Sequence, residues 1–405
     1  MLRDIDSEMQ KRGLRGIVVF GDTTLGNPDL TYVLGGNLAR GGCYIKRFGH
    51  KPLLVTSNLD LGTARKLGRV QRIETYTQWG IEKLAVKHGR TNAFTHLLAT
   101  ILKKEGIDGK IVLYGRNDLA SGVGLVDRLR KLGVKAIGES PPTLLEAARE
   151  TKSTSELQQL RHVAGKTASV IDSVTNALRN LKRTRGRLYV KGERATIGVL
   201  KKLIAKELAT RDLVAPEGTI FAIGASGADP HNQGDPNDAI REGKLIVFDI
   251  FPQSESGYWS DLTRSFVVGR ADRKTRHMFN AVYEAQTESL DFLKEGVSGH
   301  DAMEKACQVV EKWGYRTVRE IFNGKSKEVP SGFTHSLGHG VGLTIGERPY
   351  LAFLSKEPLK AGQVVTVEPG VYVPRYGGVR IEDTVVVTKH GANSLASVEK
   401  ELELV

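Results

Sequence analysis

The sequence contains little cysteine and no long apolar run. Only Cys43 and Cys307 occur among its 405 residues. Two distant cysteines form neither a disulfide framework nor a cysteine-based zinc module, so both are expected as small buried apolar side chains. No stretch approaches the roughly 18 apolar residues of a membrane-spanning helix, and we expect no membrane partner. What remains is a globular composition, with 40% hydrophobic and 26% charged residues.

The N-terminus also lacks the basic residues and the apolar run that begin a secretory signal. Acidic Asp4 and Asp6 stand there instead. We therefore expect a cytoplasmic location.

The charge is unbalanced toward the positive side, with 59 basic and 46 acidic residues and a net charge of +13. Such an excess favours acidic partners or nucleic acid as a long-range bias. The basic residues are spread along the chain, with one local concentration formed by Lys182, Arg183, Arg185, Arg187, Lys191 and Arg194. No nucleic-acid-binding module surrounds it, so a solvated surface is the preferred interpretation and no specific nucleic-acid partner is expected.

Two domains are expected, because 405 residues exceed one ordinary core. Residues 1–150 alternate β-rich runs, such as 16–20 and 110–114, with helical stretches, which predicts an α/β domain. Residues 44–55 are expected to form a hairpin that turns at Gly49-His50.

The second domain, residues 151–405, is predicted to begin with a long helix. A capping box, Ser153 with Glu156, opens that helix after the break at Pro141-Pro142. Further helices are expected at about 193–210, 275–295 and 300–313, with strand pairs between and after them. This order predicts an α+β domain with antiparallel hairpins.

The most informative segment places two carboxylates on neighbouring strands. Asp249 ends an apolar run, and Asp261 follows a polar turn. Both are equidistant from Glu255, so a turn centred there would set the aspartates opposite each other, with Cβ atoms roughly 4.5–5.5 Å apart. Because like charges so placed repel, a bound cation is the simplest compensation.

The same pattern returns near the C-terminus. Glu368 and Glu382 are equidistant from Arg375, in a turn between two Val-rich strands. They too should face each other across a hairpin. Four carboxylates on apolar strands would be very costly if dry and unpaired.

A histidine with glycine neighbours lies between the two hairpins. His339 is flanked by Gly338 and Gly340, which permit close backbone approach. Oxygen-rich ligation with one imidazole suits Mn, Co, Fe or Zn, and two such ions can polarise a carbonyl and activate water. A single acid or histidine is more often a solvated loop residue than a metal ligand. The occurrence of four such acids together with His339 makes metal binding the preferred interpretation. The remaining histidines without such a context are expected at structural or surface positions: His50, His88, His96, His162, His277, His300 and His390.

These residues resemble a known family. Asp249, Asp261, His339, Glu368 and Glu382 look like the five metal ligands of the methionine aminopeptidase, aminopeptidase P and prolidase group. The surrounding strings GYWSDLTRSFVVG, HSLGHGVGL and VEPGVYVPRYGGVRIEDT are close to its signatures. The resemblance covers the second domain and implies the pita-bread fold, with two divalent metal ions, manganese first and cobalt, zinc or iron as alternatives.

The first domain resembles the accessory domain of aminopeptidase P, prolidase and creatinase. Methionine aminopeptidases lack that domain, and creatinase lacks the ligands. The resemblance therefore favours the Xaa-Pro peptidase branch, a role of residues 1–150 as an accessory and dimerisation domain, and a homodimer.

Further roles follow from the resemblance, one position at a time. Glu368 matches the general base. His231 and His335 match histidines that contact the substrate near the scissile bond. Arg380 matches an arginine that would orient a carboxylate or Glu382 itself.

Two departures from the family pattern stand out. The aspartates are twelve residues apart, one more than is common. The family also has a histidine seven residues after the metal-binding one, where this chain has Gly346. Losing such a carbonyl donor typically costs about 10²–10³ in rate. Either His335 or Arg348 takes its place, or the substrate range is narrower.

The sequence thus predicts a metallopeptidase that cleaves short peptides at the bond before proline. Dipeptidase and aminopeptidase activity both remain open. The alternative is a catalytically altered or inactive binding protein on the same scaffold, motivated by Gly346 and by the net charge.

Overall fold

The computed structural model describes residues 3–405. Met1, Leu2 and the side chain of Asp4, on which the predicted location draws, lie outside the described part. The chain divides into two compact units, residues 1–149 and 150–405, which are described separately. No helix within residues 3–405 is long and apolar enough to cross a bilayer.

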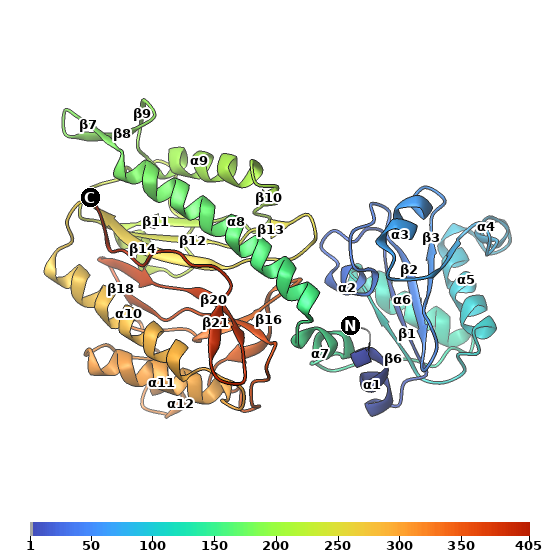
Figure 1. Cartoon of the computed structure of the whole chain (residues 1–405). Helices are drawn as coiled ribbons and strands as arrows, with labels where there is room; N and C mark the ends of the chain where they lie inside the picture. Colours follow the sequence, from blue (N-terminus) through green and yellow to red (C-terminus); the bar gives the residue numbers. More distant parts are fainter. Residues whose placement is uncertain (1–2) are drawn as a thin grey trace. The chain divides into compact units, whose positions relative to one another are not determined.

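The first unit is built on a six-stranded sheet of order β4-β3-β2-β1-β5-β6, with helices packed around it (Figure 1). The hairpin between β2 and β3 is confirmed, since Ile45 pairs with Leu53 on either side of Gly49. The strands are β1 (Gly16–Gly21), β2 (Gly42–Arg47), β3 (Leu53–Thr56), β4 (Arg72–Thr75), β5 (Ile111–Tyr114) and β6 (Ala136–Ile137). The helices are α1 (Arg3–Lys11), α2 (Pro28–Leu34), α3 (Leu61–Leu67), α4 (Ile81–His88), α5 (Arg90–Lys104), α6 (Leu119–Lys131) and, at the boundary, α7 (Leu144–Glu150).

The second unit layers helices on both sides of its antiparallel strands. Helices α8 and α9 lie on one side, and α10 and α11 on the other (Figure 1). The helices are α8 (Thr154–Arg179), α9 (Ile197–Ala209), the 3-10 turn η1 (Gly224–Ala228), α10 (Arg273–Phe292), α11 (Gly299–Lys312) and α12 (Arg319–Phe322). The strands are β7 (Lys182–Thr184), β8 (Arg187–Val190), β9 (Glu193–Arg194), β10 (Leu213–Val214), β11 (Ile220–Ile223), β12 (Leu245–Ile250), β13 (Gln253–Ser254), β14 (Leu262–Val268), β15 (Gly338–Val341), β16 (Ile345–Leu351), β17 (Val364–Val367), β18 (Gly370–Val373), β19 (Gly377–Arg380), β20 (Asp383–Val387), β21 (Ala392–Ser394) and β22 (Glu403–Leu404).

The predicted capping box at the start of α8 is confirmed. The backbone N–H of Ser153 donates to Glu156 Oε2 at 2.9 Å, and the N–H of Glu156 donates to Ser153 Oγ at 3.4 Å. The helix predicted from residue 193 begins later, at Ile197, where the Thr196 hydroxyl accepts from the Val199 N–H. The residues before it form strands, because two glycine-containing turns fold them back on one another.

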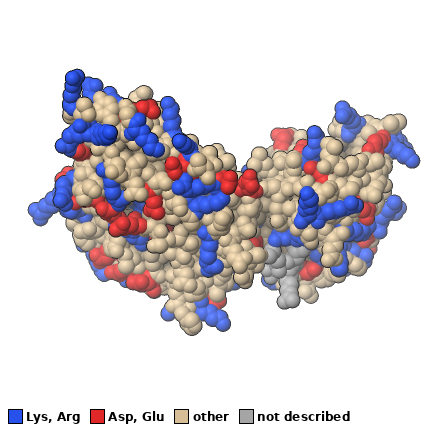
Figure 2. All heavy atoms as spheres, turned by 45° about the horizontal axis from the view of Figure 1, so that its top comes forward, with Lys and Arg blue, Asp and Glu red and all other residues tan. Residues whose placement is uncertain are grey.

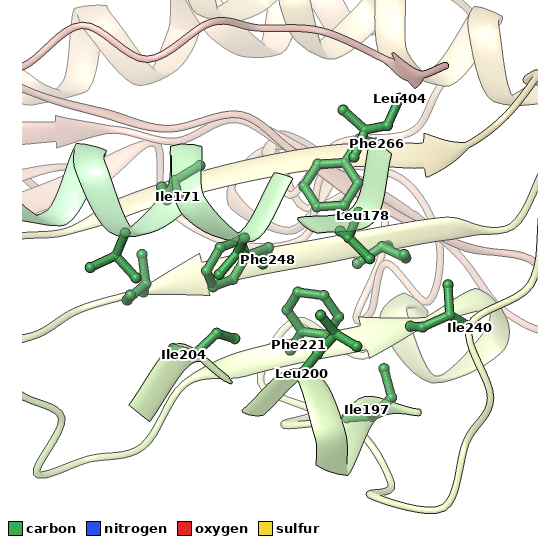
Figure 3. Packing of buried hydrophobic residues seen from close by; sticks show 14 of the residues in the cluster. Ile171, Leu178, Ile197, Leu200, Ile204, Phe221, Ile240, Phe248, Phe266 and Leu404 are labelled. Carbon is green, nitrogen blue, oxygen red and sulfur yellow. The ribbon is translucent and has the colours of Figure 1, made fainter. Parts of the chain in front are cut away.

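One hydrophobic core fixes α8 and α9 to the strands that carry the first carboxylates. Figure 3 shows aromatic rings of three neighbouring strands packed against aliphatic side chains of the two helices. These residues are Phe221, Phe248 and Phe266 on the strands, Ile171 and Leu178 on α8, and Ile197, Leu200 and Ile204 on α9. A strand buried on this face has a rigid backbone from which its other face can present polar groups.

Candidate metal centre

The first hairpin pairs its strands in a register different from the one expected. Asp249 pairs with Thr263, not with Asp261. Pairing continues beyond β12 and β14 as far as Ser254, whose N–H donates to the carbonyl of Tyr258 at 2.9 Å. The turn itself is therefore residues 255–257, and it ends at Gly257, whose φ of +87° is the left-handed conformation of a bulged hairpin turn. The centre of the hairpin therefore falls one residue beyond Glu255. The prediction that the two aspartates are directly opposed is wrong, and they lie diagonally across the strand pair.

The second hairpin follows the expected register. Val367 pairs with Asp383 on one side, and Gly370 pairs with Arg380 on the other. A single register through both pairs sets Glu368 opposite Glu382, as predicted. The two hairpins also meet, because the Glu382 N–H donates to the carbonyl of Thr263 at 3.1 Å.

His339 lies on β15 and faces both hairpins. Its Nε2 atom is 3.5 Å from Asp261 Oδ2 and 3.4 Å from Glu368 Oε1. The strand approaches its neighbours so closely that a Cβ at Gly338 would lie 2.0 Å from the carbonyl oxygen of Thr366. Glycine beside the histidine is therefore required to bring the imidazole to the carboxylates.

The donor set fits a divalent cation. Ligand atoms of Asp261, His339 and Glu382 all lie within 4.8 Å of one another. Within the described part of the chain, Asp249 Oδ1 and Glu382 Oε1 are buried without a hydrogen-bond partner. Buried carboxylate oxygens with no donor are costly, so each calls for a positive partner that the protein itself does not supply.

A hydrogen bond from a neighbouring hydroxyl fixes one oxygen of each of the two glutamates. Thr263 donates to Glu382 Oε2 at 2.6 Å, and Thr366 donates to Glu368 Oε1 at 3.0 Å. Glu382 and Glu368 thus each have one oxygen held by a threonine. Such supporting contacts orient metal ligands and limit their rotation.

The crowding of four acids changes their proton affinity when no cation is present. Desolvation and then the neighbouring Glu382 raise the pKa of Asp261 well above its usual range. Desolvation and then Glu368 do the same for the pKa of Glu382. Burial, with Asp249 adding repulsion, raises the pKa of Glu368 to about 7. A bound cation would remove this repulsion and return the acids to their charged form.

Arg380 lies at one edge of the acids and is bound by several partners. Its Nη2 atom donates to Asp249 Oδ2 at 2.5 Å, and its Nη1 donates to the Tyr372 hydroxyl at 2.7 Å. The sequence predicted that Arg380 would orient a carboxylate or Glu382 itself. In the structure it orients Asp249, while the Glu382 carboxylate receives its hydrogen bond from Thr263.

A directed hydrogen-bond chain continues from Arg380 to a histidine. His335 Nδ1 lies 2.8 Å from the carbonyl oxygen of Ser336, which can only accept, so Nδ1 carries the proton. Nε2 then accepts from Tyr372 at 3.0 Å. Desolvation, followed by the Arg380 charge, lowers the pKa of His335 to about 3, so this imidazole is neutral near pH 7.

A cavity of about 530 Å³ brings these groups together. It is lined by eight of the nine residues that the sequence nominated: Asp249, Asp261, His339, Glu368, Glu382, His231, His335 and Arg380. The exception is Arg348, which is not part of the lining. Gly346 is part of it, with a φ of +74° and open space where a side chain would begin.

The cavity also contains residues that the sequence did not nominate. Glu217 and Gln233 lie in loops, and Phe251 directly follows β12. The Gln233 side chain donates to the carbonyl of Glu217 at 3.2 Å, so one lining residue holds the other. No local pattern marks them, because their place in the cavity depends on which loops the fold brings together.

Comparison with protein families decides the relationship. The model of the peptidase family described as "Metallopeptidase family M24" matches residues 158–389. The chain belongs to this family. The resemblance inferred from the metal-ligand pattern is thereby confirmed, and membership implies divalent metal ions as cofactors.

Among M24 relatives, the Xaa-Pro dipeptidase of Pyrococcus furiosus is 38% identical over 184 residues, which is 45% of this chain and 48% of the relative. A probable dipeptidase of Mycobacterium bovis is 30% identical over 259 residues, 62% of this chain and 63% of the relative. The chain thus spans about half the length of the first of these curated relatives.

Solved structures match over nearly the whole chain. An X-Pro aminopeptidase from Thermotoga maritima has a TM-score of 0.76 at 21% identity, covering 98% of this chain and 99% of that one. An Xaa-Pro dipeptidase from Bacillus anthracis has a TM-score of 0.77 at 24% identity, covering 99% and 98%. At such identity the likeness establishes the fold, and it confirms the predicted α/β domain followed by a pita-bread domain.

Proposed function

We propose that this M24 protein is a dinuclear-metal-dependent peptidase that hydrolyses the bond preceding proline in short peptides. The observation that carries the proposal is the convergence of four carboxylates and one imidazole, with two buried carboxylate oxygens left without a donor in residues 3–405. The printed names of the relatives, dipeptidase and aminopeptidase of the Xaa-Pro type, support the substrate class.

Asp249, Asp261, His339, Glu368 and Glu382 are the proposed ligands, with manganese as the first choice and cobalt, zinc or iron as alternatives. Two such ions, when bound, would lower the pKa of water and polarise the scissile carbonyl. The oxygen-rich donor set with one imidazole is the chemistry on which this choice of metals depends.

The protein's own side chains supply the remaining steps. Glu368 is the proposed general base, and Thr366 holds its Oε1 so that Oε2 is left to accept a proton. His231 is exposed at the cavity wall and is proposed to donate a hydrogen bond to the substrate near the scissile bond. His335 has both ring nitrogens engaged, Nδ1 with the Ser336 carbonyl and Nε2 with the Tyr372 hydroxyl, so its proposed contact with substrate requires that one of these hydrogen bonds is exchanged.

Gly346 removes one donor of the family pattern. Arg348 lies outside the cavity lining, and the N–H of His335 already donates to the Ser336 carbonyl, so we propose His231 as the substitute donor. Arg380 is proposed to affect substrate binding indirectly, because it orients the proposed metal ligand Asp249. The comparisons lend no support to the alternative of a non-catalytic binding protein.

The expected homodimer, the cytoplasmic location and the accessory role of residues 1–150 stay predictions. The homodimer and the accessory role are proposed on the resemblance alone. Size measurement in solution tests the first of them.

The experiment is an assay of an Xaa-Pro dipeptide beside an Xaa-Pro-Xaa tripeptide, with the chelated protein reloaded with Mn, Co, Zn or Fe(II). Cleavage of the dipeptide alone identifies a dipeptidase, and cleavage of the tripeptide an aminopeptidase. Asp261→Asn should abolish both activities, while Asp291→Asn, an exposed acid on α10, serves as the matched control. Absence of cleavage with every metal would refute the proposal.

A further inference from the structure

A small basic sheet projects from the end of α8. It consists of β7, β8 and β9, paired antiparallel in that order, and Figure 1 shows it standing away from the rest of its unit. Its two turns are tight: Arg185 and Gly186 have φ of +51° and +72°, and Lys191 and Gly192 have φ of +47° and +89°. Two successive residues with positive φ define the type I′ turn that matches strand twist, so this is an ordered meander.

The strand register separates the meander into two faces. On β8, Leu188 and Val190 are buried and belong to the core under α8 and α9. Tyr189 points to the opposite face, because successive side chains alternate across a strand. Its cross-strand partners are Lys182 on one side and Arg194 on the other. An aromatic ring is thus flanked by two cations on the outer face.

The cations of the meander have little compensation. Arg183, on the inner face, forms an ion pair with Glu242. For the other five cations, no ion pair or side-chain hydrogen bond is found in residues 3–405: Lys182, Arg185, Arg187, Lys191 and Arg194. Figure 2 shows the resulting concentration of Lys and Arg around this segment. The meander itself contains one acid, Glu193.

We propose that the outer face of this meander binds single-stranded nucleic acid. A base would stack on Tyr189 while Lys182, Arg187 and Arg194 contact the phosphates beside it. Arginine forks suit phosphate oxygens, and stacking on an aromatic ring combined with a basic track is how proteins hold single strands without reading sequence. Cross-strand side chains have Cβ atoms roughly 5 Å apart, so the cations reach the backbone of the same stacked nucleotide.

Other anionic partners fit the face less well. A membrane-binding hairpin places apolar side chains at its tip, whereas both turns here consist of a cation and a glycine. An acidic protein partner would pair with the cations but has no bases to stack on Tyr189. Oligonucleotide binding therefore differs from membrane binding and from acidic-protein binding because it depends on the tyrosine ring.

The test measures fluorescence anisotropy of a labelled single-stranded oligonucleotide, as DNA and as RNA, with the full chain at several salt concentrations. With three cations contacting phosphates, log affinity should fall against log salt with a slope of roughly −2.1, and Arg187→Gln with Arg194→Gln should reduce the size of that slope by roughly 1.4. Tyr189→Ala should weaken binding about 5- to 100-fold, and Tyr189→Phe should restore it. The control variant, Lys325→Gln with Lys327→Gln, removes the same amount of charge from exposed positions elsewhere in the unit. It should change neither the affinity for the oligonucleotide nor the salt slope.

Three results would overturn the proposal. The first is equal binding by the wild type and the Arg187/Arg194 variant. The second is an equal loss in the Lys325/Lys327 control, which would show diffuse attraction by the net charge. The third is binding of heparin or polyglutamate as tight as that of the oligonucleotide and insensitive to Tyr189→Ala, which would indicate an acidic partner. Peptidase activity serves as the folding control and should not change in any of these variants.

Discussion

Glu368→Gln should make the metal-free protein more stable at alkaline pH while abolishing activity. Glu368 is 15% exposed and shares its site with Asp249, Asp261 and Glu382. Without a cation, ionising this acid places a negative charge in a buried site beside Asp249. Glutamine keeps the shape and the hydrogen bond from Thr366 but carries no charge.

The sign and size follow from its pKa. The native pKa of about 7 lies above the ordinary 4.5, so between these values the native state holds more protons than the unfolded state. The free energy of unfolding therefore falls as pH rises through this window. The difference corresponds to about 3 kcal/mol, at about 1.4 kcal/mol per pKa unit. His335, whose pKa is lowered to about 3, contributes the opposite trend below about pH 6.5, but equally in wild type and variant.

The assay is urea unfolding of chelated wild type and Glu368→Gln at pH 5 and pH 8. The two should be similar at pH 5, and the variant should be more stable by about 3 kcal/mol at pH 8. Manganese should stabilise the wild type more than the variant. Glu357→Gln, an exposed acid, is the matched control. A variant no more stable than the wild type at pH 8 would refute the carboxylate-repulsion argument.

Three further predictions concern residues around the acids. Arg380→Met should weaken manganese binding about 10- to 100-fold in calorimetric titration, because Asp249 loses the group that orients it; unchanged affinity would contradict this. Glu217 is exposed in the cavity lining, where its carboxylate can pair with a basic substrate side chain. Glu217→Gln should therefore raise KM for a Lys-Pro dipeptide about 1.4- to fivefold relative to norleucyl-Pro, since an exposed ion pair is worth about 0.2–1 kcal/mol; an unchanged ratio would show that Glu217 does not contact the substrate side chain. Gly346→Ala should cost about 1–2 kcal/mol of unfolding free energy, because φ is +74° although no atom obstructs the new Cβ. Its activity should survive, and a loss of activity without loss of stability would contradict a purely conformational role.

The two hairpins show how far the sequence can predict the site. Equal spacing about Arg375 predicted the Glu368–Glu382 pair correctly, since the strands continue in one register up to the turn. The same argument failed for Asp249, because Gly257 in a left-handed conformation closes a three-residue loop and moves the centre of the hairpin. A register set by turn geometry cannot be derived from spacing alone.

Side-chain partners were harder to predict than ligands. Tyr372 links Arg380 to His335, yet no motif distinguishes it from other tyrosines on Val-rich strands. Glu217 reaches the cavity from a loop far from the metal-binding pattern in sequence. The proposed metal ligands could be nominated from the sequence because ligand chemistry restricts residue type and spacing, whereas the residues that support them are selected by tertiary contact.

The central claim is that five side chains bind two divalent cations that enable hydrolysis before proline. Its most direct test measures bound manganese and proline release together, as chelated protein is titrated with Mn²⁺ in the presence of an Xaa-Pro dipeptide. No release is expected before metal is added, and full activity is expected at two equivalents per chain. Release that persists in the chelated protein, or two bound equivalents without cleavage of Xaa-Pro peptides, would contradict it.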